Sequence, residues 1–160
     1  MTARRPLLDP ATADFVQGGV SILAATSDER HRPVVTRILG CRVASDRSLV
    51  TVLAPASDAF VDAVRRTKRI AVVFSEPSTH RTIQLKGADA RTTPLRKTDG
   101  ALAKRYADGF VAEVCPLGYE EEVMRALVSC DPPGLVPVTF SPTAAFLQTP
   151  GPRAGDPLSA

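Results

Sequence analysis

A strand with one apolar and one polar face, residues 78–87, constrains the fold of this chain most strongly. Side chains on a β-strand alternate between two faces. Ile83 and Leu85 therefore face a core, whereas Thr82 and Gln84 share the opposite face. A strand that is buried on one side only is typical of an antiparallel sheet packed on one face. We therefore expect further strands of this kind.

Hairpin strands recur along the chain. Alternating apolar and polar residues, interrupted by short polar turns at residues 27–33 and 45–48, are typical of antiparallel hairpins. Gly87 permits sharp curvature, so we expect the strand that starts at residue 78 to run on to residue 91. The expected strands lie at residues 20–26, 34–44 with a bulge or bend at Gly40, 49–53, 70–75, 78–91, 135–140 and 144–148.

The sequence period changes from that of a strand to that of a helix after residue 53. Phe60 and Val64 lie four positions apart, which predicts a helix over residues 58–66 with Ser57 as its N-cap. Antiparallel strands in this number, with few helices, favour a mainly β (α+β) fold and a small barrel over a doubly wound sheet. Further helices are expected at residues 11–17, 102–114 and 119–128.

The length of 160 residues suits one domain. We expect a loose N-terminal arm at residues 1–10, the domain at residues 11–150 and an irregular tail at residues 151–160. The net charge of +3 is a mild excess, and aromatic residues make up only 5% of the chain, with no Trp. Stacking platforms for bases are therefore scarce, and we expect no nucleic-acid partner.

The apolar segments and the cysteines indicate a cytoplasmic protein. The sequence has no run of about 18 apolar residues, so we expect no membrane span. Residues 1–10 lack the apolar core of a secretory signal. Cys41, Cys115 and Cys130 are odd in number and widely spaced, which fits neither a disulfide framework nor a zinc site. We expect no metal site.

Motifs for nucleophilic, metal and dinucleotide chemistry are absent from the sequence. His31 lies in a charged turn, and His80, beside the polar strand, is the only candidate general acid, so the catalytic residues stay unassigned. An anion site without glycine motifs is possible at the helix start near Ser57, with Arg37 on a neighbouring strand. Plain helix capping and a surface arginine are the alternative interpretation.

The order of these elements resembles the pyridoxamine 5'-phosphate oxidase-like family of FMN-binding split β-barrels. Two phrases carry the resemblance, Thr-His-Arg-Thr-Ile-Gln-Leu-Lys-Gly at residues 79–87 and Phe-Leu-Gln-Thr-Pro-Gly-Pro at residues 146–152. It covers residues 14–155. The resemblance implies a six-stranded antiparallel split β-barrel with a few helices, a homodimer, and FMN in a groove at the dimer interface.

The resemblance also implies which residues contact the cofactor. Arg37 matches the basic residue of the second strand and Ser57 the hydroxyl residue at the helix start, so both are expected to hold the phosphate together with Arg81. The residues expected to contact the isoalloxazine ring or the ribityl chain are Thr51, Val52, Leu53, Thr82 and Gln84.

These inferences favour an FMN-dependent oxidoreductase that acts on an unknown small-molecule substrate. The alternative is a non-catalytic or regulatory dimer of the same fold that binds haem or another flavin. Asp58 favours the alternative, because FMN-binding members usually place a Lys or Arg directly after the residue that matches Ser57, and an acid beside a phosphate is unfavourable. A third possibility is an unrelated small β-barrel module.

Overall fold

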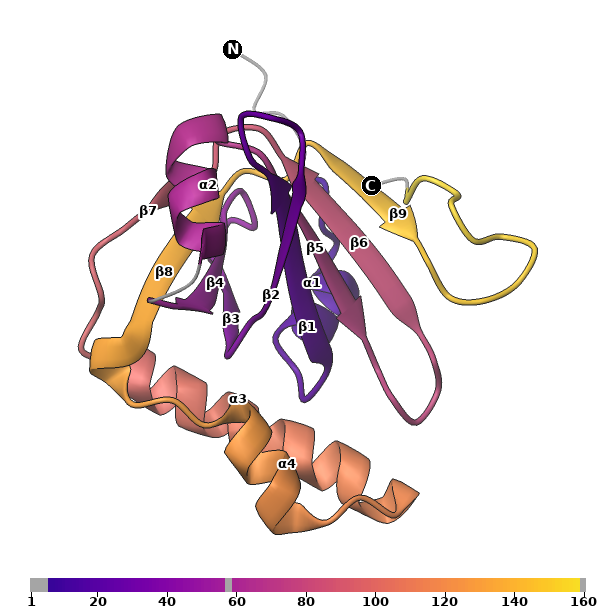
Figure 1. Cartoon of the computed structure of the whole chain (residues 1–160). Helices are drawn as coiled ribbons and strands as arrows, with labels where there is room; N and C mark the ends of the chain where they lie inside the picture. Colours follow the sequence, from indigo (N-terminus) through magenta and orange to yellow (C-terminus); the bar gives the residue numbers. More distant parts are fainter. Residues whose placement is uncertain (1–5, 57–58, 159–160) are drawn as a thin grey trace.

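The fold consists of two antiparallel sheets and four α-helices within the described ranges (Figure 1). The structure is a computed structural model and describes residues 6–56 and 59–158. Sheet A has the strand order β2-β1-β5-β6-β9 and sheet B the order β3-β4-β8-β7. The strands of sheet A are β1 (Ser21–Ser27), β2 (Pro33–Arg37), β5 (Ile70–Ser75), β6 (Thr82–Gly87) and β9 (Ala144–Leu147). Those of sheet B are β3 (Cys41–Val43), β4 (Val50–Pro55), β7 (Arg91–Thr92) and β8 (Leu135–Phe140).

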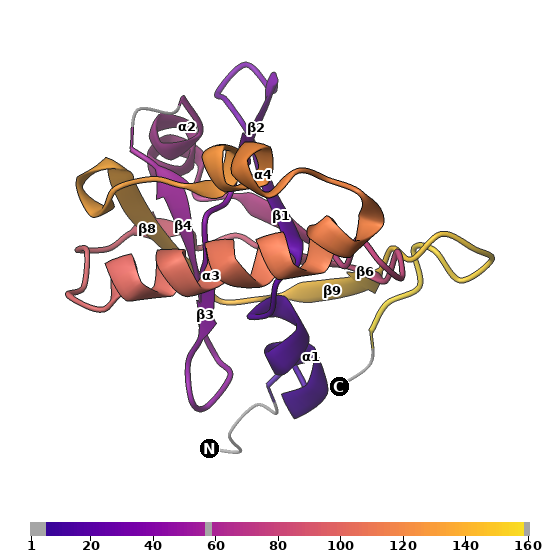
Figure 2. The same cartoon turned by 90° about the horizontal axis from the view of Figure 1, so that it is seen from below.

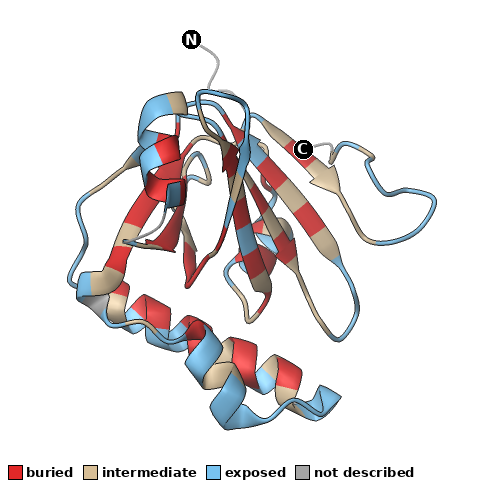
Figure 3. Ribbon diagram, in the orientation of Figure 1, coloured by how far each residue is buried: buried red, intermediate tan, exposed pale blue. Residues whose placement is uncertain are grey.

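The core is formed by the apolar faces of the two sheets. Phe74 and Leu85 from sheet A and Val52 and Phe140 from sheet B are fully buried. Buried residues alternate with partly exposed ones along β5 and β6, as the red and tan bands in Figure 3 show. The predicted two-faced character of β6 is confirmed, because Ile83 and Leu85 are buried while Thr82 and Gln84 stay half-buried.

The chain crosses between the sheets four times, after β2, after β4, after β6 and after β8. At the first crossing Gly40 has φ +148°, a conformation that side chains disfavour, and the Leu39 N–H donates to the Leu53 carbonyl at 2.8 Å. The expected continuous strand at residues 34–44 was wrong, because the chain leaves sheet A after Arg37 and enters sheet B at Cys41. The resemblance had also implied a six-stranded barrel. Nine strands in two sheets, and no closed barrel, are present in the described part of the chain.

The strand expected at residues 78–91 is shorter in the structure and is interrupted. Its first residues form the β5–β6 turn, where the His80 N–H donates to the Glu76 carbonyl at 2.9 Å and His80 has φ 60°. The strand leaves sheet A at Gly87, and the chain enters sheet B at Arg91. A β-carbon on Gly87 would lie 2.6 Å from the Phe140 ring, so glycine allows sheet B to pack closely at this bend.

Four helices surround the sheets: α1 (Pro10–Val16), α2 (Ala59–Thr67), α3 (Asp99–Val114) and α4 (Glu121–Val128). The Asp9 side chain caps α1 by accepting the Thr12 N–H at 2.7 Å. Ser57 and Asp58, at the expected start of α2, lie outside the described residues. Helices α3 and α4 lie below the ends of the strands in Figure 1, and in Figure 2, which views the molecule from below, they lie in front of the sheets. No helix in residues 6–56 and 59–158 has both the length and the apolar character required to cross a membrane.

Tyr106 fixes the middle of α3 against the sheet. Its side chain is 4% exposed, and its hydroxyl has no hydrogen-bond partner of good geometry among the described residues. Burial raises the pKa of Tyr106 to about 12, although the nearby Arg37 guanidinium acts in the opposite direction. The folded state therefore keeps the phenol proton to higher pH than the unfolded chain, in which tyrosine ionises near pH 10.

We expect alkaline unfolding to depend on Tyr106. Because its pKa is raised in the folded state, its stabilising effect is complete below about pH 10 and is lost as the pH rises through about 12, a change of about 2–3 kcal/mol. In Tyr106→Phe the free energy of unfolding should decrease less between about pH 10 and 12 than in the wild type, and it should change little at pH 7. Urea unfolding across this pH range measures the effect. An unchanged alkaline slope in Tyr106→Phe would contradict it.

Candidate functional site

A row of four polar side chains crosses sheet B. The strand register pairs Arg42 with Thr51, Thr51 with Thr139, and Thr139 with Arg91. Residues paired in this way project from the same face of a sheet. Two threonines therefore lie in the centre of the row, with an arginine at each end.

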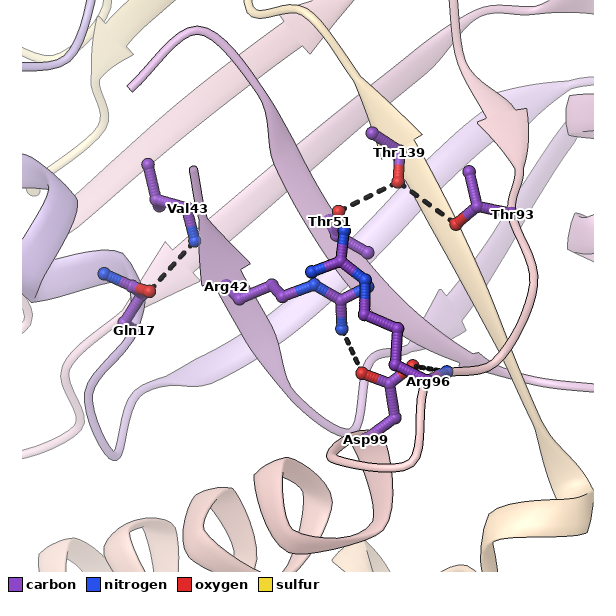
Figure 4. Close-up of polar contacts among 8 residues, drawn as sticks. All are labelled: Gln17, Arg42, Val43, Thr51, Thr93, Arg96, Asp99 and Thr139. Carbon is purple, nitrogen blue, oxygen red and sulfur yellow. Dashed lines mark hydrogen bonds and ion pairs between the residues drawn. The ribbon is translucent and has the colours of Figure 1, made fainter. Parts of the chain in front are cut away.

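The threonine hydroxyls form a hydrogen-bonded chain. The Thr51 and Thr139 oxygens are 2.8 Å apart, and the Thr139 and Thr93 oxygens are 3.3 Å apart (Figure 4). Two hydrogen bonds use two of the three hydroxyl hydrogens, so one O–H remains able to donate. The chain can present this donor to a ligand at either end.

These groups line a pocket of about 640 Å³, which we call the arginine–threonine pocket. Ligand sites of small molecules and cofactors have volumes of about 300–1,000 Å³. The segment that follows β7 forms one wall and contributes Arg96, which lines the pocket together with Arg42 and Thr51 (Figure 4). The lining residues are Arg42, Val43, Ala44, Ser45, Leu49, Thr51, Arg91, Thr93, Pro94, Leu95, Arg96 and Thr139.

A buried carboxylate supports this pocket from behind. Asp99, the first residue of α3, is fully buried and forms an ion pair with Arg42. Its other oxygen accepts the backbone N–H of Arg96 at 2.8 Å. Asp99 does not line the pocket itself. The carboxylate thus connects β3, the pocket wall and α3.

The lining of the pocket suits an anion, and part of it is apolar. Three arginines line it, and no carboxylate is among the lining residues that the structure describes. Arginine presents several N–H donors in a planar fork that matches carboxylate and phosphate oxygens. Leu49 and Leu95 supply apolar surface on the rim. A ligand with an anionic group and a flat or apolar body fits this combination.

Among the residues that the resemblance assigned to β4, Thr51 is the one that reaches this pocket. Val52 belongs to the core between the sheets, and Leu53 is covered from the side of Gly40; both side chains are fully buried. Ser57 lies outside the described residues, so the structure does not place it.

The remaining predicted residues lie on sheet A. Arg37 and Gln84 occupy one row across its outward face, separated by Leu23 and Val73. Three strand spacings, roughly 14 Å, therefore separate Arg37 from Gln84. The Arg37 guanidinium lies 5.9 Å from the Phe110 ring centroid. The structure does not bring this pair into the arginine–threonine pocket.

Arg81 and Thr82, at the start of β6, have partners elsewhere. The Arg81 guanidinium lies 4.1 Å from the ring centroid of Phe15 in α1. The Thr82 hydroxyl lies 2.8 Å from that of Ser75, and its backbone N–H donates to Thr149 at 3.0 Å. Both residues are thus held by the fold at the end of sheet A.

The sequence interpretation missed most of the pocket, namely Arg42, Arg91, Thr93, Arg96 and Thr139. The signal that could have found part of it is alternation, which places Arg42 and Thr51 on outward positions of paired strands. No groups of three or more His, Cys, Asp or Glu suited to a metal occur in the described residues. His80 lies in an exposed turn.

Comparisons with known proteins show the fold but give no close relative. No family model matches the chain, and no curated protein matches it by sequence. Solved structures that match include an F420 Reductase, with a TM-score of 0.58 and 15% identity over 86% of this chain and 98% of that one. HupZ of Group A Streptococcus matches with a TM-score of 0.58 and 12% identity, over 92% of this chain and 99% of that one.

A third similar structure is a pyridoxamine 5'-phosphate oxidase-related, FMN binding protein from Nostoc punctiforme. Its TM-score is 0.52 at 15% identity, and the match covers 91% of this chain and 87% of that one. The resemblance inferred from the sequence is therefore confirmed at the level of the fold. At 12–15% identity these structures show the fold alone.

Proposed function

We propose that this chain is an FMN-binding, oxidoreductase-like protein of the pyridoxamine 5'-phosphate oxidase type, with the flavin phosphate in the arginine–threonine pocket. The observation that carries the proposal is a pocket of about 640 Å³ that three arginines line without any described carboxylate. The fold supports it, because it is shared with a protein named as FMN binding. The four chain crossings between the sheets fit an opened, split barrel.

The donor set of the pocket fits a phosphate-bearing flavin. A phosphate monoester carries close to two negative charges at neutral pH and accepts several hydrogen bonds. Arg96 and Arg91 can supply charged donors, and the threonine chain can supply a neutral one. Leu49 and Leu95 offer apolar surface to a planar ring. When bound, the isoalloxazine supplies the redox chemistry, while these residues bind and orient it.

The proposal includes a homodimer. The outward face of sheet A exposes Leu23 and Val35 by 41% and 59% of their surfaces, with the half-buried Val73 beside them. An apolar sheet face of this kind supports contact with a second copy.

F420 is the second candidate cofactor. One similar structure is named an F420 Reductase, at a TM-score of 0.58. The pocket recognises an anionic group and an apolar body, so it can accept either molecule. Parallel titrations with FMN and F420 distinguish the two, because the true cofactor is expected to bind at least tenfold more tightly.

FMN titration followed by the quenching of flavin fluorescence tests the proposal. We expect saturable binding by the wild type and a decrease in affinity of about 10- to 100-fold in Arg96→Ala, because a charged hydrogen bond contributes about 1.5–3 kcal/mol. Arg105→Ala is the matched control, since Arg105 is an exposed arginine of α3 that does not line the pocket. Absence of FMN binding, or equal losses in both variants, would contradict the proposal.

A further inference from the structure

We infer that Asp99 is a positioning residue of the arginine–threonine pocket, which holds Arg42 and the Arg96 segment in the arrangement that receives an anion. The inference rests on the proposed function, because it takes the pocket to be the phosphate site. It goes further by assigning a role to a buried acid that touches no ligand. An acid close to an anion site would otherwise be expected to weaken binding.

The contacts of Asp99 support this role. One carboxylate oxygen pairs with the Arg42 guanidinium from β3, and the other accepts the Arg96 N–H at 2.8 Å. Its side chain is 0% exposed, whereas that of Arg42 is 19% exposed. Asp99 therefore uses both oxygens to join two arginine residues that come from separate parts of the chain.

The geometry of the arginines explains why a positioning group is needed. The side chains of Arg42 and Arg96 line the same pocket together with Thr51, so two like charges share one site (Figure 4). Without a partner they would separate, and the long side chains would sample many rotamers. The carboxylate behind Arg42 offsets the repulsion and fixes one of the two groups. A site arranged in advance binds its ligand more tightly, because less ordering is needed on binding.

Two mechanisms predict opposite results for Asp99→Asn. If Asp99 acts only through its charge, its removal makes the pocket more positive and anion binding becomes tighter. If Asp99 positions the arginines, binding becomes weaker, because asparagine replaces one of the two acceptor oxygens with an NH2 group. That group is itself a donor and would face either the Arg42 guanidinium or the Arg96 N–H. Whether anion binding becomes tighter or weaker in Asp99→Asn therefore distinguishes a positioning role of Asp99 from a purely electrostatic one.

The experiment measures the affinity of the full chain for inorganic phosphate and for FMN. We expect Asp99→Asn to weaken both by about tenfold, at a temperature where circular dichroism shows the variant to be folded. Asp108→Asn is the matched control, because Asp108 is also an acid of α3 that pairs with cations, Lys104 and Arg125, away from the pocket. Unchanged or tighter binding in Asp99→Asn would overturn the inference.

A double-variant cycle tests whether Asp99 acts through Arg42. In an Arg42→Gln background, Asp99→Asn is expected to weaken phosphate binding by clearly less than tenfold, because only the contact with the Arg96 N–H is left to lose. A full tenfold further loss would contradict the part of the role that acts through Arg42. If Asp99→Asn does not fold, Asp99→Glu keeps the charge and displaces the oxygens, so weaker binding is again expected and unchanged binding overturns the inference.

The outcomes separate this inference from the proposed function. A wild type that binds phosphate but neither FMN nor F420 would overturn the flavin function and leave the role of Asp99 to be decided by its variants. A wild type that binds FMN through Arg96, with Asp99→Asn unaffected, would overturn only the positioning role. A wild type that binds neither phosphate nor FMN would overturn both.

Discussion

Gly19→Ala is expected to lower the free energy of unfolding by about 3 kcal/mol or more, because two backbone segments meet at this position. A β-carbon on Gly19 would lie 2.3 Å from the Gly109 carbonyl oxygen and 2.4 Å from its carbonyl carbon. Neither backbone can give way as a flexible side chain does. Helix α3 would have to move away from the end of sheet A, and Tyr106 and Asp99 would move with it.

Urea unfolding of matched alanine variants measures this effect. Gly109→Ala is the control, since its β-carbon would lie 3.3 Å from the Gly19 Cα and alanine is favoured in a helix interior. We expect Gly109→Ala to change stability by less than about 1 kcal/mol, because the mild contact and the gain in helix propensity oppose each other. Equal stability of Gly19→Ala and the wild type would contradict the close packing of α3.

Arg42→Ala is expected to cost about 3–5 kcal/mol, because it leaves a fully buried carboxylate without its cation. Asp99→Ala should cost less. In that variant the stranded group is Arg42, which is already 19% exposed and can reach water on its long side chain. We therefore expect the loss of stability in Arg42→Ala to exceed that in Asp99→Ala, whereas equal contributions from the two residues would give equal losses.

Thermal and urea unfolding of both single variants and of Arg42→Ala/Asp99→Ala measure this asymmetry. The double variant should be more stable than Arg42→Ala alone, because no buried charge is left unpaired. An Asp99→Ala variant that is less stable than Arg42→Ala would contradict this account, as would simple additivity of the two losses.

The sequence predicted the elements better than their arrangement. Hydrophobic alternation located most strands, and the period of 3.6 located the four helices, because both patterns are local. The two-residue strand β7 was missed, since it is too short to show a period. The prediction of one continuous strand over residues 78–91 was wrong. The strand ends at Gly87, where the chain packs against Phe140, and local alternation does not report such a long-range contact.

The site was predictable only in part for the same reason. Thr51 and Thr139 share a hydrogen bond although 88 positions separate them. Alternation indicates which side chains share a face of one strand, but it does not say which strands become neighbours. Arg37 and Gln84 were thus assigned to a common ligand site, whereas the structure separates them by two strands of sheet A. Whether they contact a cofactor remains a prediction.

The comparison of FMN with riboflavin tests the central claim most directly, because the two ligands differ only in the phosphate. We expect the wild type to bind FMN at least about 30-fold more tightly than riboflavin, since charged hydrogen bonds to phosphate contribute about 2 kcal/mol or more. Arg96→Ala should reduce this ratio to within a few fold of one, while Arg105→Ala should leave it unchanged. A wild type that binds the two flavins equally, or a ratio that survives in Arg96→Ala, would show that the arginine–threonine pocket does not hold the phosphate.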